Sequence, residues 1–135
     1  TNTAQSAVAQ TKLARDVADA KLDWQKERRR FAKAILEQAE QHYYSAAARV
    51  EQEKARLVES KGRKPDPKFT VASFDQQAAE KQAKYDSAKM DADKQRLSTS
   101  QAESKYNQLL QKLDMMRQSA ASQNSTGGAV PPSMP

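Results

Sequence analysis

His42 is the only histidine in this sequence and the first residue to consider for catalysis or metal binding. A metal site on a helix needs further ligands at helical spacing, such as a Glu-x-x-His pair, and Glu37, Glu40 and Gln41 do not supply one. The sequence also lacks a glycine-rich phosphate loop and a Ser, His and acid arrangement in a strand-turn context. We therefore expect no enzyme, metal, cofactor or small-molecule substrate, and a packed His42.

A run of basic residues, WQKERRRFAKAI (24–35), is the second candidate. On a helix, Arg28, Arg29 and Arg30 spread over about 200°, so they cannot form one patch. A shared face at spacing i, i+3, i+4, i+7 contains Lys26, Arg29, Arg30 and Lys33. We interpret this ridge as a solvated or salt-bridged helix face. The alternatives are contact with an anionic membrane, with nucleic acid or with a protein partner.

A second basic group lies in GRKPDPKFTVAS (62–73) and at the residue before it. Its members are Lys61, Arg63, Lys64 and Lys68. Cations beside Phe69 and Val71 at the tip of a hairpin suit a membrane surface or an acidic protein. The simpler interpretation is a soluble turn whose two apolar residues cap the end of a bundle.

Composition predicts helices with little core. Hydrophobic residues make up 37% of the 135 residues and aromatic residues 6%, and much of the apolar share is alanine, which buries little area. Residues 1–61 and 68–126 contain no glycine or proline. We therefore expect a first helix at 1–61, a loop at 62–73, a second helix at 74–118 and a disordered tail at 119–135.

Charge and hydropathy narrow the class of protein. The net charge of +6 favours acidic partners, although charges of both signs are mixed. The absence of cysteine excludes disulfides. No run of residues is apolar enough for a membrane span, and the first residues do not resemble a secretory signal. We expect a soluble protein of unassigned compartment.

The first helix has apolar residues spaced mostly 4, 3 and 4 apart, an eleven-residue repeat typical of a nearly straight helix. Gly62 is the expected C-terminal stop. The main residues of this predicted packing and assembly seam are Trp24, Arg28, Phe31, Ile35, His42, Val50 and Leu57. Arg28 is a charged residue at a packing position, and we expect it to face a carboxylate such as Glu103.

The second helix follows a seven-residue repeat, which predicts left-handed supercoiling around a partner. Ser73 and Gln76 are spaced as a capping box at its start. The predicted seam runs from Phe74 to Ala120. It contains several alanines as well as Lys81, Gln95 and Thr99. Its bulky residues are Tyr85, Tyr106, Leu109, Leu113 and Met116.

Together these features predict an all-α fold, a long antiparallel helical hairpin resembling a coiled coil. Folding at the loop should place Trp24 beside Leu109 and Leu113, and Val50 beside Tyr85. Because the two seams differ in period and apolar residues such as Leu36 lie off them, we expect hairpins to assemble into a multi-helix bundle.

Two segments, HYYSAAARVEQEKARL (42–57) and AEKQAKYDSAKMDADKQRL (79–97), together with the basic helices and proline-broken tip, resemble parts of BAR-type membrane-bending domains. The resemblance covers the helices only and implies a membrane-surface module. That family normally has three long helices, whereas two are predicted here. The Ala- and Gln-rich hairpin also resembles virion internal or scaffolding proteins and the stalk hairpins of export machines, which implies contact with nucleic acid.

We therefore predict a structural protein whose helices mediate self-association or docking into a larger complex. The expected partner is a second copy or a helical protein. An anionic membrane is the first alternative and nucleic acid the second, because the basic residues are not interleaved with aromatic ones.

Overall fold

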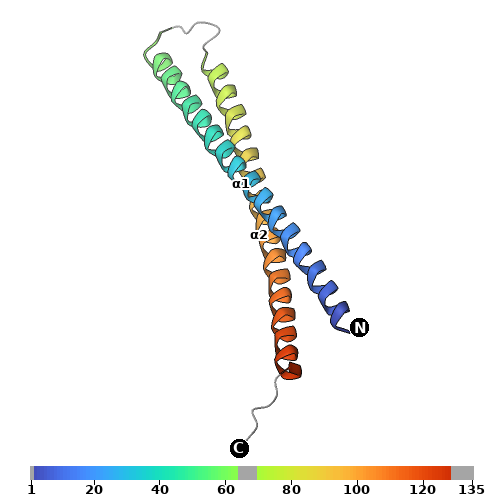
Figure 1. Cartoon of the computed structure of the whole chain (residues 1–135). Helices are drawn as coiled ribbons and strands as arrows, with labels where there is room; N and C mark the ends of the chain where they lie inside the picture. The colour runs from blue at the N-terminus through green and yellow to red at the C-terminus, as the bar shows by residue number, and fades with distance from the viewer. Residues whose placement is uncertain (1, 64–69, 129–135) are drawn as a thin grey trace, which may run out of the picture. The chain divides into compact units, whose positions relative to one another are not determined.

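The computed structural model describes residues 2–63 and 70–128, with side chains described as far as residue 122. These residues form two long helices, α1 (Asn2–Ser60) and α2 (Val71–Gly128), which pack against each other (Figure 1). The predicted all-α helical hairpin is confirmed.

Gly62 stops α1, as predicted. Its φ angle is 75°, and its N–H donates to the carbonyl of Glu59 at 2.9 Å. A left-handed residue just past a helix pairs carbonyls that would otherwise lack a partner, and glycine adopts this conformation without a steric penalty. Residues 64–69 of the predicted loop lie outside the described residues.

Thr70 caps the start of α2. Its Oγ1 accepts a hydrogen bond from the N–H of Ser73 at 3.2 Å, and its carbonyl accepts from the N–H of Phe74 at 3.1 Å. The predicted cap at Ser73 is therefore wrong. Thr70 offers the same kind of hydroxyl one turn earlier, so the helix begins at Val71 rather than at Phe74.

The far end of α2 also differs from the prediction. The helix continues past residue 118 to Gly128, so the expected tail at 119–135 is wrong for 119–128. This stretch contains no proline, and its first glycine is Gly127, so nothing before that point breaks the helix. Residues 129–135 lie outside the described residues.

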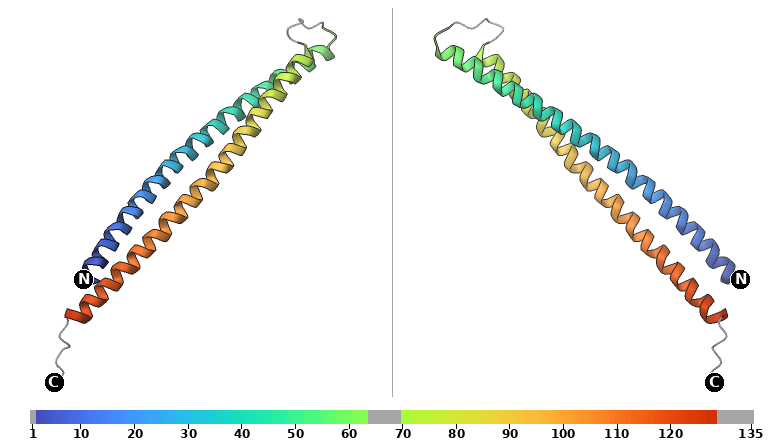
Figure 2. Two further views of the ribbon diagram at one scale, coloured as in Figure 1. Left: turned by 90° about the vertical axis from the view of Figure 1, so that its right-hand side faces the viewer. Right: turned by 60° about the vertical axis from the view of Figure 1, so that its left-hand side comes forward.

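The chain divides into two units, each of which contains part of both helices. The terminal unit joins Thr1–Arg28 with Ser98–Pro135, and the loop unit is Arg29–Leu97. Within each unit α1 and α2 lie side by side and run in opposite directions (Figure 2).

Bulky apolar residues hold the helices of the terminal unit together. The ring of Trp24 stacks on that of Tyr106, with centroids 5.6 Å apart and planes 18° from parallel. The prediction placed Trp24 beside Leu109 and Leu113, so the observed register differs by about one turn. The most buried apolar residues of this unit are Val17, Ala20 and Leu113.

Small residues hold the helices of the loop unit together. On α2 the most buried are Ala88 and Ala92, and on α1 the most buried is Ser45, which is only 3% exposed. Small side chains let two helix backbones approach closely. The α1 positions turned towards α2, named here the inner seam, are Phe31, Ala34, Gln38, Gln41, Ser45, Ala48, Gln52 and Ala55.

Hydrogen bonds between side chains also join α1 and α2 in the loop unit. The side chain of Gln82 accepts from Ser45 at 3.1 Å and also from Arg49. Gln52 donates to a carboxylate oxygen of Asp75 at 2.6 Å. Each such bond stabilises the interface by about 1 kcal/mol, so polar contacts partly replace bulk here.

The covered positions of both helices recur every seven residues. Every residue of the heptad seam predicted for α2, from Phe74 to Ala120, lies at a half-buried or buried position. The eleven-residue seam predicted for α1 is wrong at Arg28 and at every position beyond Phe31, because the covered positions of α1 alternate spacings of 3 and 4. A heptad on α2 requires a heptad on the helix that covers it, and α1 meets that requirement with small and amide residues.

Candidate interaction surface

The structure separates the predicted seam residues into two sets. Leu113 is buried, and the half-buried residues are Trp24, Phe31, Tyr85, Tyr106, Leu109 and Met116. The exposed residues are Arg28, Ile35, His42, Val50 and Leu57. The structure therefore does not bring the second set into the contact between α1 and α2, apart from the ring contact of His42 described below.

Arg28 does not occupy a packing position. Its guanidinium lies over the ring of Trp24, 5.2 Å from the ring centroid, where the electron-rich face attracts a cation. The described residues show no ion pair between Arg28 and Glu103, the carboxylate expected beside it. Arg28 thus packs against an aromatic ring while its charge stays exposed to solvent.

The predicted basic ridge is solvent-exposed. Lys26 belongs to the terminal unit, and Arg29, Arg30 and Lys33 belong to the loop unit. In the part of the chain that the structure describes, Lys26, Arg29 and Lys33 form no ion pair. Their charges are therefore open to solvent or to a partner.

The second basic group is described only in part. Lys61 and Arg63 are exposed next to the end of α1. Lys64 and Lys68 lie outside the described residues, as does the neighbouring Phe69.

His42 lies at the edge of a ring contact between the helices. Its imidazole meets the ring of Tyr85 edge-on, with centroids 5.2 Å apart. Tyr85 was expected to meet Val50, which lies two turns further along α1. Among the described residues, no group of three or more metal-ligating side chains surrounds His42 or any other position.

Tyr44 is the residue with a shifted pKa in this neighbourhood. Its hydroxyl donates to Oε1 of Glu40 at 3.3 Å, and the ammonium of Lys81 lies 5.6 Å from the centre of its ring. The hydrogen bond to Glu40 and the negative charge of that carboxylate raise the pKa of Tyr44 above its ordinary value. Because the side chain is exposed, this cluster resembles a surface network rather than a catalytic site.

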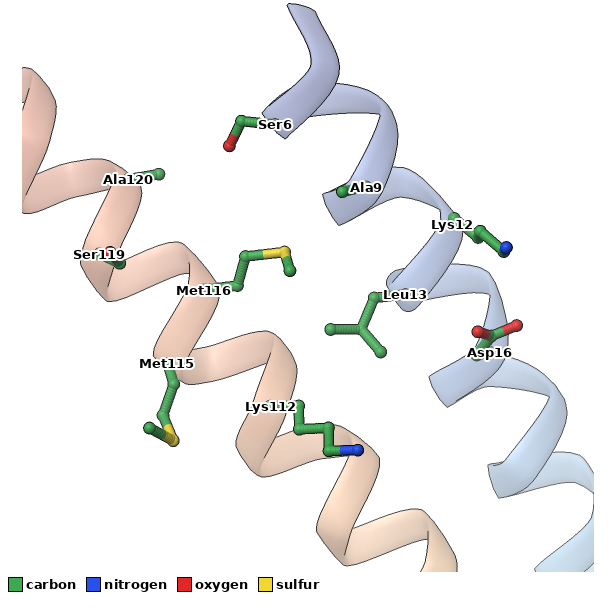
Figure 3. A pocket seen from close by; sticks show the side chains of 10 residues that line it. All are labelled: Ser6, Ala9, Lys12, Leu13, Asp16, Lys112, Met115, Met116, Ser119 and Ala120. Carbon is green, nitrogen blue, oxygen red and sulfur yellow. The ribbon is translucent and has the colours of Figure 1, made fainter. Parts of the chain in front are cut away.

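A hollow separates the helices near the chain ends in the terminal unit. Leu13 and Met116 point towards each other across it, whereas Met115 and Lys12 point away (Figure 3). Met115 is 68% exposed. The lining is mostly apolar with no convergent set of polar groups, so it does not resemble a small-molecule site.

A second surface, which the sequence interpretation recognised only in separate parts, lies on the loop-unit part of α1. Here a second set of residues, named the outer seam, also alternates spacings of 3 and 4, and every member is exposed. The outer seam consists of Ala32, Leu36, Ala39, Tyr43, Ala46, Val50, Glu53 and Leu57. The regular heptad was readable in the sequence, but the eleven-residue interpretation combined residues from two different faces of the helix.

The comparisons identify no relative for this hairpin: no family model, curated protein or solved structure matches the chain. No helix among the described residues has a stretch long and apolar enough to cross a membrane. The function therefore has to be argued from the exposed surfaces themselves.

Proposed function

We propose that this chain is a structural protein that assembles with other helices through the outer seam of α1. The observation that carries the proposal is that α1 has two heptad seams in the loop unit. One of them is covered by α2, and the other is open to solvent. A heptad pattern of apolar residues is typical of a helix that packs against another helix.

The geometry of the helix places the two seams on nearly opposite sides. At 3.6 residues per turn, the centres of the inner and outer seams are about 150° apart around the axis. A single neighbouring helix cannot cover both. The pattern is that of a helix in the interior of a bundle, with one neighbour on each side.

The distribution of bulk supports the same conclusion. Leu36, Tyr43, Val50 and Leu57 are between 53% and 69% exposed, while the inner seam, after Phe31 at its start, carries only alanine, serine and glutamine. Side chains of this size contribute about 1.5 to 3 kcal/mol each when fully buried. A lone hairpin leaves most of that free energy unused on this face.

The test is the solution mass of the wild-type chain and of a Val50→Lys/Leu57→Lys variant, measured by sedimentation over a series of concentrations. We expect the wild type to associate and its melting temperature to rise with concentration. The variant should be monomeric, with a melting temperature that does not depend on concentration.

The control is Leu97→Lys, which introduces a charge at a residue of the same unit that is 61% exposed on α2. This variant should associate like the wild type. A wild-type chain that stays monomeric at every concentration, or a control that dissociates as readily as the double variant, would contradict the proposal.

A second candidate function is binding to an anionic membrane surface. It rests on the exposed cations Arg29, Arg30 and Lys33 of the loop unit. We expect such binding to require acidic lipid and to be lost at high salt. Sedimentation with phosphatidylserine vesicles at low salt tests it, and no binding under those conditions excludes it.

A further inference from the structure

A hollow on the surface of α1 coincides with the outer seam. It is lined by Arg49, Val50, Glu53, Lys54 and Leu57, all on one helix. Four of these residues are spaced i, i+3, i+4 and i+7. In coiled coils, four residues at this spacing form the hole that receives one side chain of the facing helix.

The outer seam also alternates in size. Its a positions are Leu36, Tyr43, Val50 and Leu57, and three of its d positions are alanines, at 32, 39 and 46. One heptad before Leu36, the a position is the exposed Arg29. The remaining d position is Glu53, which is exposed and forms a surface ion pair with Arg56 at 3.2 Å.

We propose that the outer seam is covered by the same seam of a second copy of this chain, running antiparallel, with Arg29 of each copy facing Glu53 of the other. This inference rests on the proposed function and adds the partner, the direction and the register. Its basis is that the seam is complementary to itself in charge and in size.

Charge selects the antiparallel direction. In a parallel pair in register, each position meets its own copy, so Arg29 would meet Arg29 and Glu53 would meet Glu53 across the interface. Like charges placed together in this way destabilise a pair of helices. In an antiparallel pair the a positions lie opposite d positions, so the cation and the carboxylate can meet.

Size agrees with the same register. When Arg29 lies opposite Glu53, Tyr43 lies opposite Ala39. Leu36 then lies opposite Ala46, and Val50 opposite Ala32. Three of the four bulky side chains thus meet an alanine, which allows the close packing that helix pairs need, and Leu57 lies opposite Gln25.

This register also brings like charges close. Glu40 lies beside its own copy near the two-fold axis, Lys26 lies beside Lys54 of the other copy, and Arg28 lies beside Arg56. All of these side chains are exposed, so water and salt screen the repulsion.

Arg29 also fits the hollow. Opposite Glu53, its aliphatic stem would lie between Val50 and Leu57 and its guanidinium would reach the carboxylate. Arginine commonly packs its stem on apolar surface while its head forms an ion pair. The existing Glu53 and Arg56 pair is exposed and weak, so it does not prevent this exchange.

The experiment is a charge-reversal cycle read by sedimentation equilibrium. Arg29→Glu and Glu53→Arg should each weaken the dimer by about tenfold or more, because each places two pairs of like charges in the interface. The double variant should recover an affinity close to that of the wild type.

A second arm is a mixture of the two single variants. In the proposed register one chain then presents two carboxylates to two guanidinium groups of the other, so mixing should form a heterodimer tighter than either homodimer. A parallel pair in register would form the same heterodimer, but there each single variant would keep the two like-charge pairs of the wild type, so weakening of the single-variant homodimers is the result that decides the direction. An effect of either substitution on the helix of its own chain would not be rescued by mixing.

The outcomes separate this inference from the proposed function. If Val50→Lys/Leu57→Lys dissociates the protein but mixing the charge variants restores nothing, the register is overturned and assembly through the outer seam stands. If the wild type is monomeric throughout, both are overturned. Because the chain has no cysteine, a Leu36→Cys chain mixed with an Ala46→Cys chain gives an independent check. Their oxidation should yield a cross-linked heterodimer, and its absence would also contradict the register.

Discussion

The terminal unit and the loop unit use the same two helices to build different interfaces. In the terminal unit, Leu113 is 3% exposed and an aromatic stack joins Trp24 to Tyr106. In the loop unit the helices meet mainly through Ala88, Ala92 and hydrogen bonds, and apart from Phe31 the large apolar residues of α1 are exposed. The comparison shows that α1 packs bulky residues such as Trp24 against α2 in the terminal unit, whereas in the loop unit most of its bulky residues are exposed.

This difference also separates two sources of stability. Burial of bulk is sensitive to the removal of atoms, whereas close approach of small residues is sensitive to their addition. The two units should therefore respond in opposite ways to changes in side-chain size. The predictions below should be measured at one fixed protein concentration, because association would otherwise shift the apparent stability.

The largest effect is expected at the buried leucine of the terminal unit. Leu113→Ala should lower the free energy of unfolding by about 3 kcal/mol, because it leaves a cavity among packed residues. Urea unfolding followed by circular dichroism measures the loss. The matched control is Leu97→Ala at a residue 61% exposed, which should cost less than about 0.5 kcal/mol. Equal losses would mean that bulk does not stabilise the terminal unit as described.

Enlarging a small residue should break the loop unit. Ala92 is 1% exposed, so Ala92→Leu has no room for its side chain and should destabilise the protein by about 2 kcal/mol. The same measurement on Ala83→Leu, at an exposed position of the same helix, should give a change near zero. A neutral result for Ala92→Leu would show that the helices do not approach closely there.

The polar contacts of the loop unit should contribute less. Gln82→Leu removes the acceptor of Ser45, whose side chain is buried, and should cost about 1.5 kcal/mol. Adding Ser45→Ala to this variant should recover part of the loss, because no hydroxyl then remains without a partner. If Ser45→Ala lowers the stability of the Gln82→Leu variant as much as it lowers the stability of the wild type, the two residues are not coupled.

The smallest effect concerns pH. Because Glu40 raises the pKa of Tyr44, the protonated phenol is favoured in the folded protein. Its contribution to stability is therefore present at neutral pH and is lost as the pH rises through the folded pKa in the alkaline range. Ultraviolet titration compared with Tyr44→Phe should show that Tyr44 ionises above the ordinary range. Glu40→Gln should lower its pKa, and an unchanged titration in that variant would remove the carboxylate as the cause.

Much of the fold was predictable because its signals are local. The absence of glycine and proline over long stretches predicted two helices, Gly62 predicted the end of α1, and the heptad of α2 predicted its covered face. Each of these depends on backbone preferences or on a single regular period.

The covered face of α1 in the loop unit was not predictable from bulk alone. The sequence offers two heptad faces there, and Val50 and Leu57 make the outer one more apolar than the one that α2 covers. Hydropathy ranks the two faces but does not say which neighbour each one has. That choice depends on close approach and on hydrogen bonds such as the one from Gln52 to Asp75, which involve residues far apart in the sequence.

The inner seam has a mechanical consequence. Its alanine and amide residues recur at heptad spacing. If one helix slid by seven residues, each contact would therefore be replaced by another of the same kind. The hydrogen bonds from Ser45 to Gln82 and from Gln52 to Asp75 distinguish the observed register from one shifted by seven residues. A third polar residue of the seam, Gln41, adds no such bond through its Oε1, which is buried without a hydrogen-bond partner. We expect the loop unit, when pulled along its axis, to slip by a heptad before its helices separate, which would make it the more compliant part of the hairpin.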